Sequence, residues 1–160
     1  MEAQIQSSGS MGSVDAEYVN TAFDLIQLDH QEGQLAATKT KDPRIIDLSS
    51  KIIAQADALS PGLQAAANVE GIKAPTILTP DLAARVARLQ NLSGRDFDRQ
   101  YVADELALHK RAVAVFGKED SSTKDAALRT QVETELPAVQ GNLDSLTVLS
   151  SEYNPTATSS

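Results

Sequence analysis

Apolar residues recur every three to four positions along the chain, the spacing that places them on one face of an α-helix. The first such segment begins near Ser13 or Asp15 and ends near Lys39. Its predicted buried stripe consists of Val19, Phe23, Ile26, His30, Gly33 and Ala37. The pattern therefore predicts one long amphipathic helix and places His30 on its apolar face.

A second helix is predicted from Asp42-Pro43 to a point before Gly71. Asp caps free backbone N–H groups, and Pro fits the first helical position because no hydrogen bond is lost there. The predicted stripe consists of Ile45, Ser49, Ile52, Ala56, Leu59, Leu63 and Ala66. Pro61 removes an N–H inside this pattern and clashes with the preceding turn, so we expect a kink or a break.

Further helices are predicted over residues 80–92 and 95–116, separated at Ser93-Gly94. The longer one carries a stripe of Val102, Leu106, His109, Val113 and Phe116. The last helix is predicted over residues 123–149, with a bend at Pro137.

No strand pattern competes, so the sequence predicts an all-α protein. Four long amphipathic segments joined by short turns predict an up-down-up-down four-helix bundle, with one helix interrupted near Ser93-Gly94. The 80–92 segment either extends the third long helix or lies across the end of the bundle. The predicted domain spans residues 14–149, between a tail at 1–13, disordered or added to the natural sequence, and a disordered tail at 150–160.

Composition and charge exclude several kinds of function. The chain has 160 residues, no Cys and a net charge of -8. Without Cys it forms no disulfide, no thiolate metal site and no cysteine nucleophile. The acidic balance argues against binding to nucleic acid or anionic lipid, which both attract clustered Lys and Arg. No apolar run reaches the ~18 residues of a membrane span, and no secretory leader is recognisable.

Both histidines, His30 and His109, fall on predicted apolar stripes. A histidine in a bundle core is either packed and satisfied by one hydrogen bond, or a metal ligand or proton shuttle. Asp29 and Glu32 lie within a turn of His30, and Glu105 lies one turn before His109. A mixed site of histidine and carboxylate ligands for iron, manganese or zinc is therefore geometrically possible.

The spacing argues against the di-iron site known from helical bundles. That site uses Glu-x-x-His on two helices and a Glu on each of the other two, and no Glu-x-x-His occurs in this sequence. Motifs for phosphate loops, zinc proteases and serine hydrolases are also missing. The sequence therefore predicts no catalytic residue, and the absence of a recognisable site favours a cofactor-free protein.

A set of short motifs occurs in a fixed order along the chain: Gly33-Gln-Leu-Ala36, Gly71-Ile-x-x-Pro75, Leu92-Ser-Gly-x-x-Phe97-Asp98-x-x-Tyr101-Val102, His109-Lys-x-Ala112-Val-x-x-Phe116 and Leu136-Pro137. In this order and spacing they resemble the bacterial domain of unknown function 4142 family, over about residues 15–149. The resemblance implies a ferritin-like helical bundle in a protein exported across the inner membrane, with its signal peptide removed.

The resemblance also implies histidines on several helices, because members of that family commonly show them there. In this chain only His109 matches, whereas Ala56 and Asn142 stand at the other positions. This departure weakens any metal or oxidoreductase role that the family likeness would suggest.

Three functions remain open at this level. The favoured one is a non-enzymatic periplasmic or otherwise extracytoplasmic protein that binds a protein partner or contributes to envelope stress tolerance, through a groove at Pro61-Gly62 or the connection 71–79. The second is a degenerate ferritin-like metal or redox protein that uses His30, His109, Asp29, Glu32 and Glu105. The third is a carrier with a pocket for a small ligand inside the bundle. The sequence leaves the partner and the oligomeric state undetermined.

Overall fold

The computed structural model describes residues 12–73, 75 and 77–155, with side chains from residue 14 onward. Of the tails predicted at 1–13 and 150–160, residues 1–11 and 156–160 lie outside the described residues, whereas residues 12–13 already belong to the first helix. The described chain forms five helices and no strand: α2 (Gly12–Lys39), α3 (Pro43–Val69), α4 (Pro80–Gln90), α5 (Gly94–Ser122) and α6 (Ala126–Tyr153). The all-α prediction is therefore confirmed for this part of the chain. No described helix is both long and apolar enough to cross a membrane.

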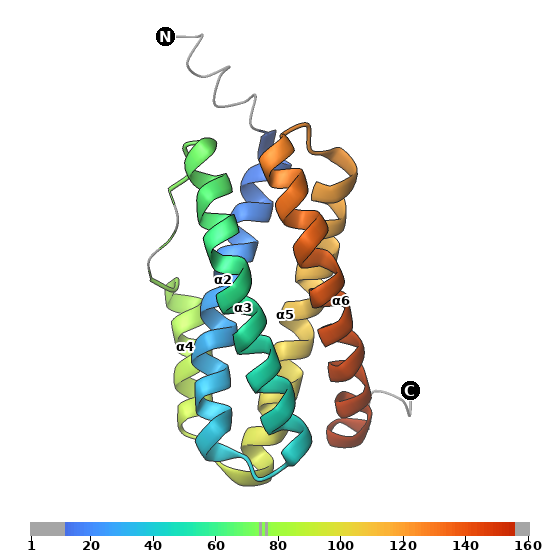
Figure 1. Cartoon of the computed structure of the whole chain (residues 1–160). Coiled ribbons are helices and arrows are strands. Elements are labelled where there is room, and N and C mark those ends of the chain that lie inside the picture. The colour runs from blue at the N-terminus through green and yellow to red at the C-terminus, as the bar shows by residue number, and fades with distance from the viewer. Residues whose placement is uncertain (1–11, 74, 76, 156–160) are drawn as a thin grey trace.

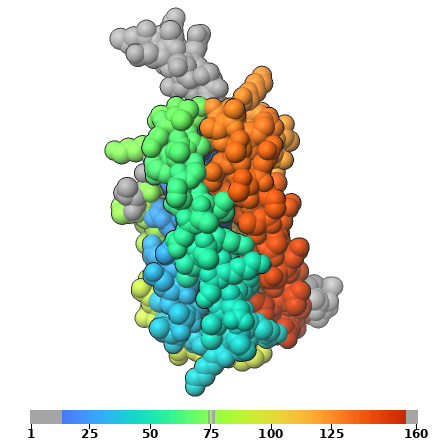
Figure 2. Space-filling view, in the orientation of Figure 1, coloured from blue at the N-terminus to red at the C-terminus, as the bar shows by residue number. Residues whose placement is uncertain are grey.

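The four long helices lie side by side, and the short helix α4 lies along α2 (Figure 1). Helix α2 packs against α3 and α5, and α6 packs against the same two helices from the other side. Figure 2 shows α3, in green and teal, and α6, in orange and red, packed along one face of the molecule. The molecule is thus a helical bundle with an added fifth helix.

The predicted up-down-up-down alternation is wrong for the third long helix. The connection after α3 and helix α4 together run back toward the end of the bundle where α3 began (Figure 1). As a result α5 runs parallel to α3, and only then does α6 reverse direction. A short turn would have forced an antiparallel neighbour, but residues 70–79 and α4 together are long enough to run back along the bundle.

Helix α4 follows neither of its predicted alternatives, since it neither extends α5 nor lies across the end of the bundle. It ends at Gln90, and α5 begins at Gly94 after a short turn. Gly94 has a φ of 58°, in the left-handed region that glycine adopts without steric cost. This turn reverses the chain, so α4 lies beside α2 instead of continuing into α5.

The predicted stripe of α3 is confirmed, because all of its residues are buried except Leu59, which is half-buried. Pro61 does not end this helix, which is continuous from Pro43 to Val69. Gly62 leaves room for Gln131 of α6, whose side-chain amide donates to the Leu59 carbonyl at 3.1 Å. The groove expected at Pro61-Gly62 is therefore filled by Gln131.

The buried face of α2 is rotated from the predicted stripe. Val19, Phe23 and Gly33 of that stripe are buried as predicted, whereas Ile26 and His30 are half-buried and Ala37 is exposed. The face that packs inward runs through Tyr18, Ala22, Leu25, Leu28, Asp29, Glu32 and Ala36. Each residue turns the helix by about 100°, so a shift of one position moves His30 off the core and brings Asp29 into it.

Helix α6 continues past Pro137 and past the predicted domain end at Leu149 to reach Tyr153. The Tyr153 side chain is buried, and its hydroxyl donates to Asp42 at 2.5 Å. This bond ties the end of α6 to the capping residue of α3. Residues 150–153 are therefore helical because their last side chain is anchored in the bundle.

The apolar core falls into two clusters. One cluster gathers the first half of α2, the second half of α5 and residues such as Leu63 and Val132. The other gathers the first half of α3, the start of α5 and residues such as Leu89 and Leu146. Between them along α2 and α5 lie buried polar residues: Asp29, Glu32, Asp104, Glu105 and His109.

Glu135 of α6 is a further buried acid, away from that polar group. It is 1% exposed and accepts a hydrogen bond from the Tyr18 hydroxyl. Burial raises the pKa of Glu135 from 4.5 to about 7, although hydrogen bonds from Tyr18 and Gln131 act to lower it. Folding therefore favours the neutral, protonated form of this carboxyl.

This raised pKa predicts a pH-dependent stability. The neutral Glu135 carboxyl contributes to the free energy of unfolding. This contribution is fully present below the ordinary pKa of 4.5 and is lost as the pH rises through about 7. Glu135→Gln carries no charge at any pH, so relative to wild type it should gain up to about 3 kcal/mol between roughly pH 4.5 and 8. Urea unfolding at a series of pH values measures this difference, and a difference that stays constant with pH would contradict it.

Candidate functional site

The strongest candidate site lies where α2 faces α5, between the two apolar clusters. Helix α2 supplies Asp29 and Glu32, which are three residues apart and so share one face. Helix α5 supplies Glu105 and His109, which are four residues apart and share one face for the same reason. The structure thus brings together four of the five candidate residues from the sequence.

Asp29, Glu105 and His109 have the proximity that a metal ion requires. One ligand atom from each lies within 4.8 Å of those of the other two. His109 and Glu105 are fully buried, and Asp29 is nearly so. The group offers one imidazole nitrogen and two carboxylates, a donor set that suits manganese, iron or zinc.

His109 is held as a neutral ring with one free nitrogen. Its Nδ1 atom donates to the backbone oxygen of Glu105 at 2.8 Å, which assigns the ring proton to Nδ1. Burial lowers the pKa of His109 to about 4. Nε2 therefore carries a lone pair at neutral pH, and it has no hydrogen-bond partner among the described residues. In metal-ligating histidines, the ring nitrogen that does not bind the metal commonly donates to a backbone carbonyl.

Two carboxyl groups of the site, those of Asp29 and Glu105, also lack donors. Oδ1 of Asp29 and both side-chain oxygens of Glu105 are buried and receive no hydrogen bond from an N–H or hydroxyl group of the described residues. When protonated, these carboxyls hydrogen-bond, within the described chain, only to one another and to Glu32. Burial, followed by the nearby carboxylates, raises the pKa of Glu105 well above its usual range, and burial does the same for Asp29. Buried polar atoms without partners are costly, and a bound cation would satisfy them.

Arg85 of α4 is the important residue that the sequence reasoning missed. Its side chain is 14% exposed, and its guanidinium donates to both carboxylate oxygens of Glu32, at 2.5 and 2.7 Å. A spacing signal was present, because Arg85 lies three residues after Leu82 and four before Leu89. A charged residue on that apolar face must point inward with its partner.

The charges around the site do not balance without a further cation or bound protons. The group contains four carboxyls and two guanidinium groups: Asp29, Glu32, Asp104, Glu105, Arg85 and Arg88. When all four are ionised, two negative charges remain, which is the charge that one divalent cation neutralises. His109 adds no charge because it is neutral at pH 7.

His30 does not belong to this group. Its Nε2 atom lies 2.5 Å from the Asp57 carboxylate on α3, and its side chain is 37% exposed. The rotated face of α2 explains this position, since His30 follows the inward-facing Asp29 by one residue. The two histidines therefore have different partners and different exposure.

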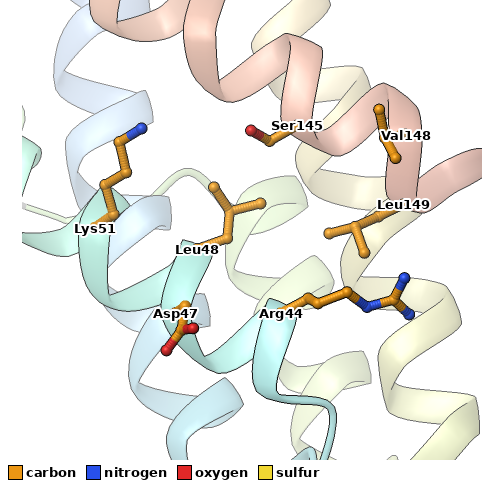
Figure 3. Close-up of a pocket in the computed structure, with 7 residues that line it drawn as sticks. All are labelled: Arg44, Asp47, Leu48, Lys51, Ser145, Val148 and Leu149. Carbon is orange, nitrogen blue, oxygen red and sulfur yellow. The ribbon is translucent and has the colours of Figure 1, made fainter.

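A second feature is a surface groove of about 400 Å³ between α3 and α6 (Figure 3). Leu48 and Leu149 point toward one another across it, with Arg44 and Lys51 along its edge. Arg44 is already paired with Asp42 and Glu152. This groove lies at the surface, in contrast to the pocket expected inside the bundle for a small-ligand carrier.

Comparison with known families identifies the family of this chain. The model of the Domain of unknown function (DUF4142) matches residues 1–149. No curated protein and no solved structure matches this chain.

Proposed function

This chain belongs to the DUF4142 family, and we propose that it binds one divalent transition-metal ion through Asp29, Glu105 and His109. The observation that carries the proposal is that these three buried side chains each bring one ligand atom within 4.8 Å of the others. Each of them also has a buried polar atom that receives no hydrogen bond from an N–H or hydroxyl group of the described residues. The ion is manganese, iron or zinc, given one imidazole and two carboxylate donors. Metal binding thus replaces partner binding as the function that the geometry supports best.

The chemistry of the site supports a role in holding the ion. Two ionised carboxylates and a neutral imidazole make the complex with a divalent cation uncharged, as a buried position requires. His109 is already oriented by its bond to the Glu105 backbone. Metal binding of this kind adds its free energy to folding, because the unfolded chain does not present the ligands together.

The chain topology supports a ferritin-like classification of the bundle as part of the same proposal. Ferritin-like folds have one long crossover connection between their second and third long helices. The connection between α3 and α5, which includes α4, has this course (Figure 1). The periplasmic location and a part in envelope stress tolerance remain proposals that rest on the family likeness.

The proposal is tested by adding manganese or zinc chloride to the full chain and measuring binding and thermal unfolding. At a free metal concentration 100 times Kd, we expect about 2.7 kcal/mol of stabilisation, or roughly 5–10 °C in Tm. Titration calorimetry should give one ion per chain.

His109→Ala should abolish this binding, and Glu105→Gln should weaken it strongly, because each removes a ligand. His30→Ala is the matched control, since it removes a histidine whose partner is Asp57 and should keep wild-type affinity. Wild-type protein that takes up neither metal, or an equal loss in the His30 and His109 variants, would refute the proposed site.

A further inference from the structure

Arg85 occupies a position suited to a cation. Its guanidinium lies among three carboxylates from two other helices, Glu32 of α2 and Asp104 and Glu105 of α5. Beyond the paired hydrogen bonds to Glu32, Nε lies 3.9 Å from Asp104 Oδ2 and Nη2 lies 3.7 Å from Glu105 Oε1. One permanent positive charge is thus surrounded by three acids.

Glu105 connects this position with the proposed metal site. Its Oε1 atom is the one nearest Arg85, whereas its Oε2 atom lies 3.4 Å from Nδ1 of His109. The carboxylate of Glu105 therefore lies beside the guanidinium of Arg85 and also belongs to the group formed with Asp29 and His109, so it is shared by two neighbouring cation positions. In two-metal sites the ions lie about 3.5–4 Å apart, a separation that one carboxylate bridges.

We propose that Arg85 fills the second cation position of a two-cation site and thereby limits the chain to one bound metal ion. The inference rests on the proposed function for the first ion. The acids that would hold a second ion are Glu32 and Asp104, with Glu105 shared. A guanidinium suits this role because it stays charged and binds a carboxylate through two parallel hydrogen bonds.

The experiment measures metal stoichiometry in Arg85→Ala, using manganese chloride and zinc chloride separately on the full chain. The number of bound ions per chain should rise from one in wild type to two in the variant. Elemental analysis after desalting and titration calorimetry both measure this number. For manganese, electron paramagnetic resonance adds a second readout, because two neighbouring ions couple magnetically and a single ion does not. If Arg85→Ala does not fold, Arg85→Gln is measured with the same expectation.

Two variants serve as matched controls. Arg85→Lys keeps a positive charge in the same position and should still bind one ion. Arg88→Ala removes the same charge from the same helix, but its side chain is 55% exposed and lies 3.4 Å from Asp104 only. It should also bind one ion. This result would show that the second ion in Arg85→Ala depends on the position of Arg85 and not simply on the loss of one positive charge.

The outcomes distinguish the inference from the proposed function. If wild type and the neutral Arg85 variants each bind one ion, the inference is overturned and the proposed function stands. If wild type binds none while a neutral Arg85 variant binds one, the proposed function fails and the cation position of Arg85 is supported. If none of these proteins binds manganese or zinc, both fail.

Discussion

Replacing Arg85 by alanine is expected to lower the free energy of unfolding in metal-free buffer by about 3–5 kcal/mol. The loss is large because Glu32 is fully buried and receives two hydrogen bonds from Arg85. Without the guanidinium, the fold must keep that carboxylate in a low-dielectric interior or protonate it. Chemical denaturation of wild type and variant at neutral pH measures the difference.

Arg88→Ala is the control, because exposed ion pairs contribute at most about 1 kcal/mol. Adding Glu32→Gln to Arg85→Ala should recover part of the loss, since the double variant no longer buries that unpaired carboxylate. An Arg85→Ala variant that is as stable as Arg88→Ala would show that the buried ion pair does not carry the expected energy.

Phe97→Ala should destabilise the protein by a similar amount, about 3–5 kcal/mol. Phe97 is fully buried near the start of α5, and its ring stacks on Tyr101 with centroids 5.7 Å apart. Truncation removes this contact and leaves a cavity in the cluster that includes Leu89 of α4. Because Tyr101 lies one turn before Glu105, the change also loosens the support of the site.

The matched control for Phe97 is Val148→Ala on α6, where the side chain is 63% exposed. This change should alter stability by less than about 0.5 kcal/mol. Urea unfolding of both variants gives the comparison, and a loss below about 1 kcal/mol for Phe97→Ala would contradict the packing described for this end of the bundle.

The helices themselves could be predicted because periodicity and capping are local properties. Asp42 caps α3 through its side chain, and Pro43 begins the helix, as predicted from the sequence. The direction of α5 could not be predicted in the same way, because the path of a long connection depends on what it packs against. The position of α4 beside α2 could not be predicted for the same reason, because it follows from tertiary packing.

Only part of the candidate site could be predicted from the sequence, because the buried face of α2 also depends on tertiary packing. Helix α2 carries apolar residues in adjacent positions, such as Tyr18 and Val19, or Ala22 and Phe23. Two neighbouring stripes therefore fit the pattern. Both are buried at these four residues, and further along the helix the packing of α3 and α5 decides which one is buried. That choice separates Asp29, which enters the site, from His30, which pairs with Asp57.

The metal site is tested most directly by a crystal structure of the full chain grown with zinc and measured at the zinc absorption edge. An anomalous difference peak should lie about 2.0–2.2 Å from ligand atoms of Asp29, Glu105 and His109. Zinc found only at surface carboxylates, or beside His30 and Asp57, with no peak between α2 and α5, would contradict the account.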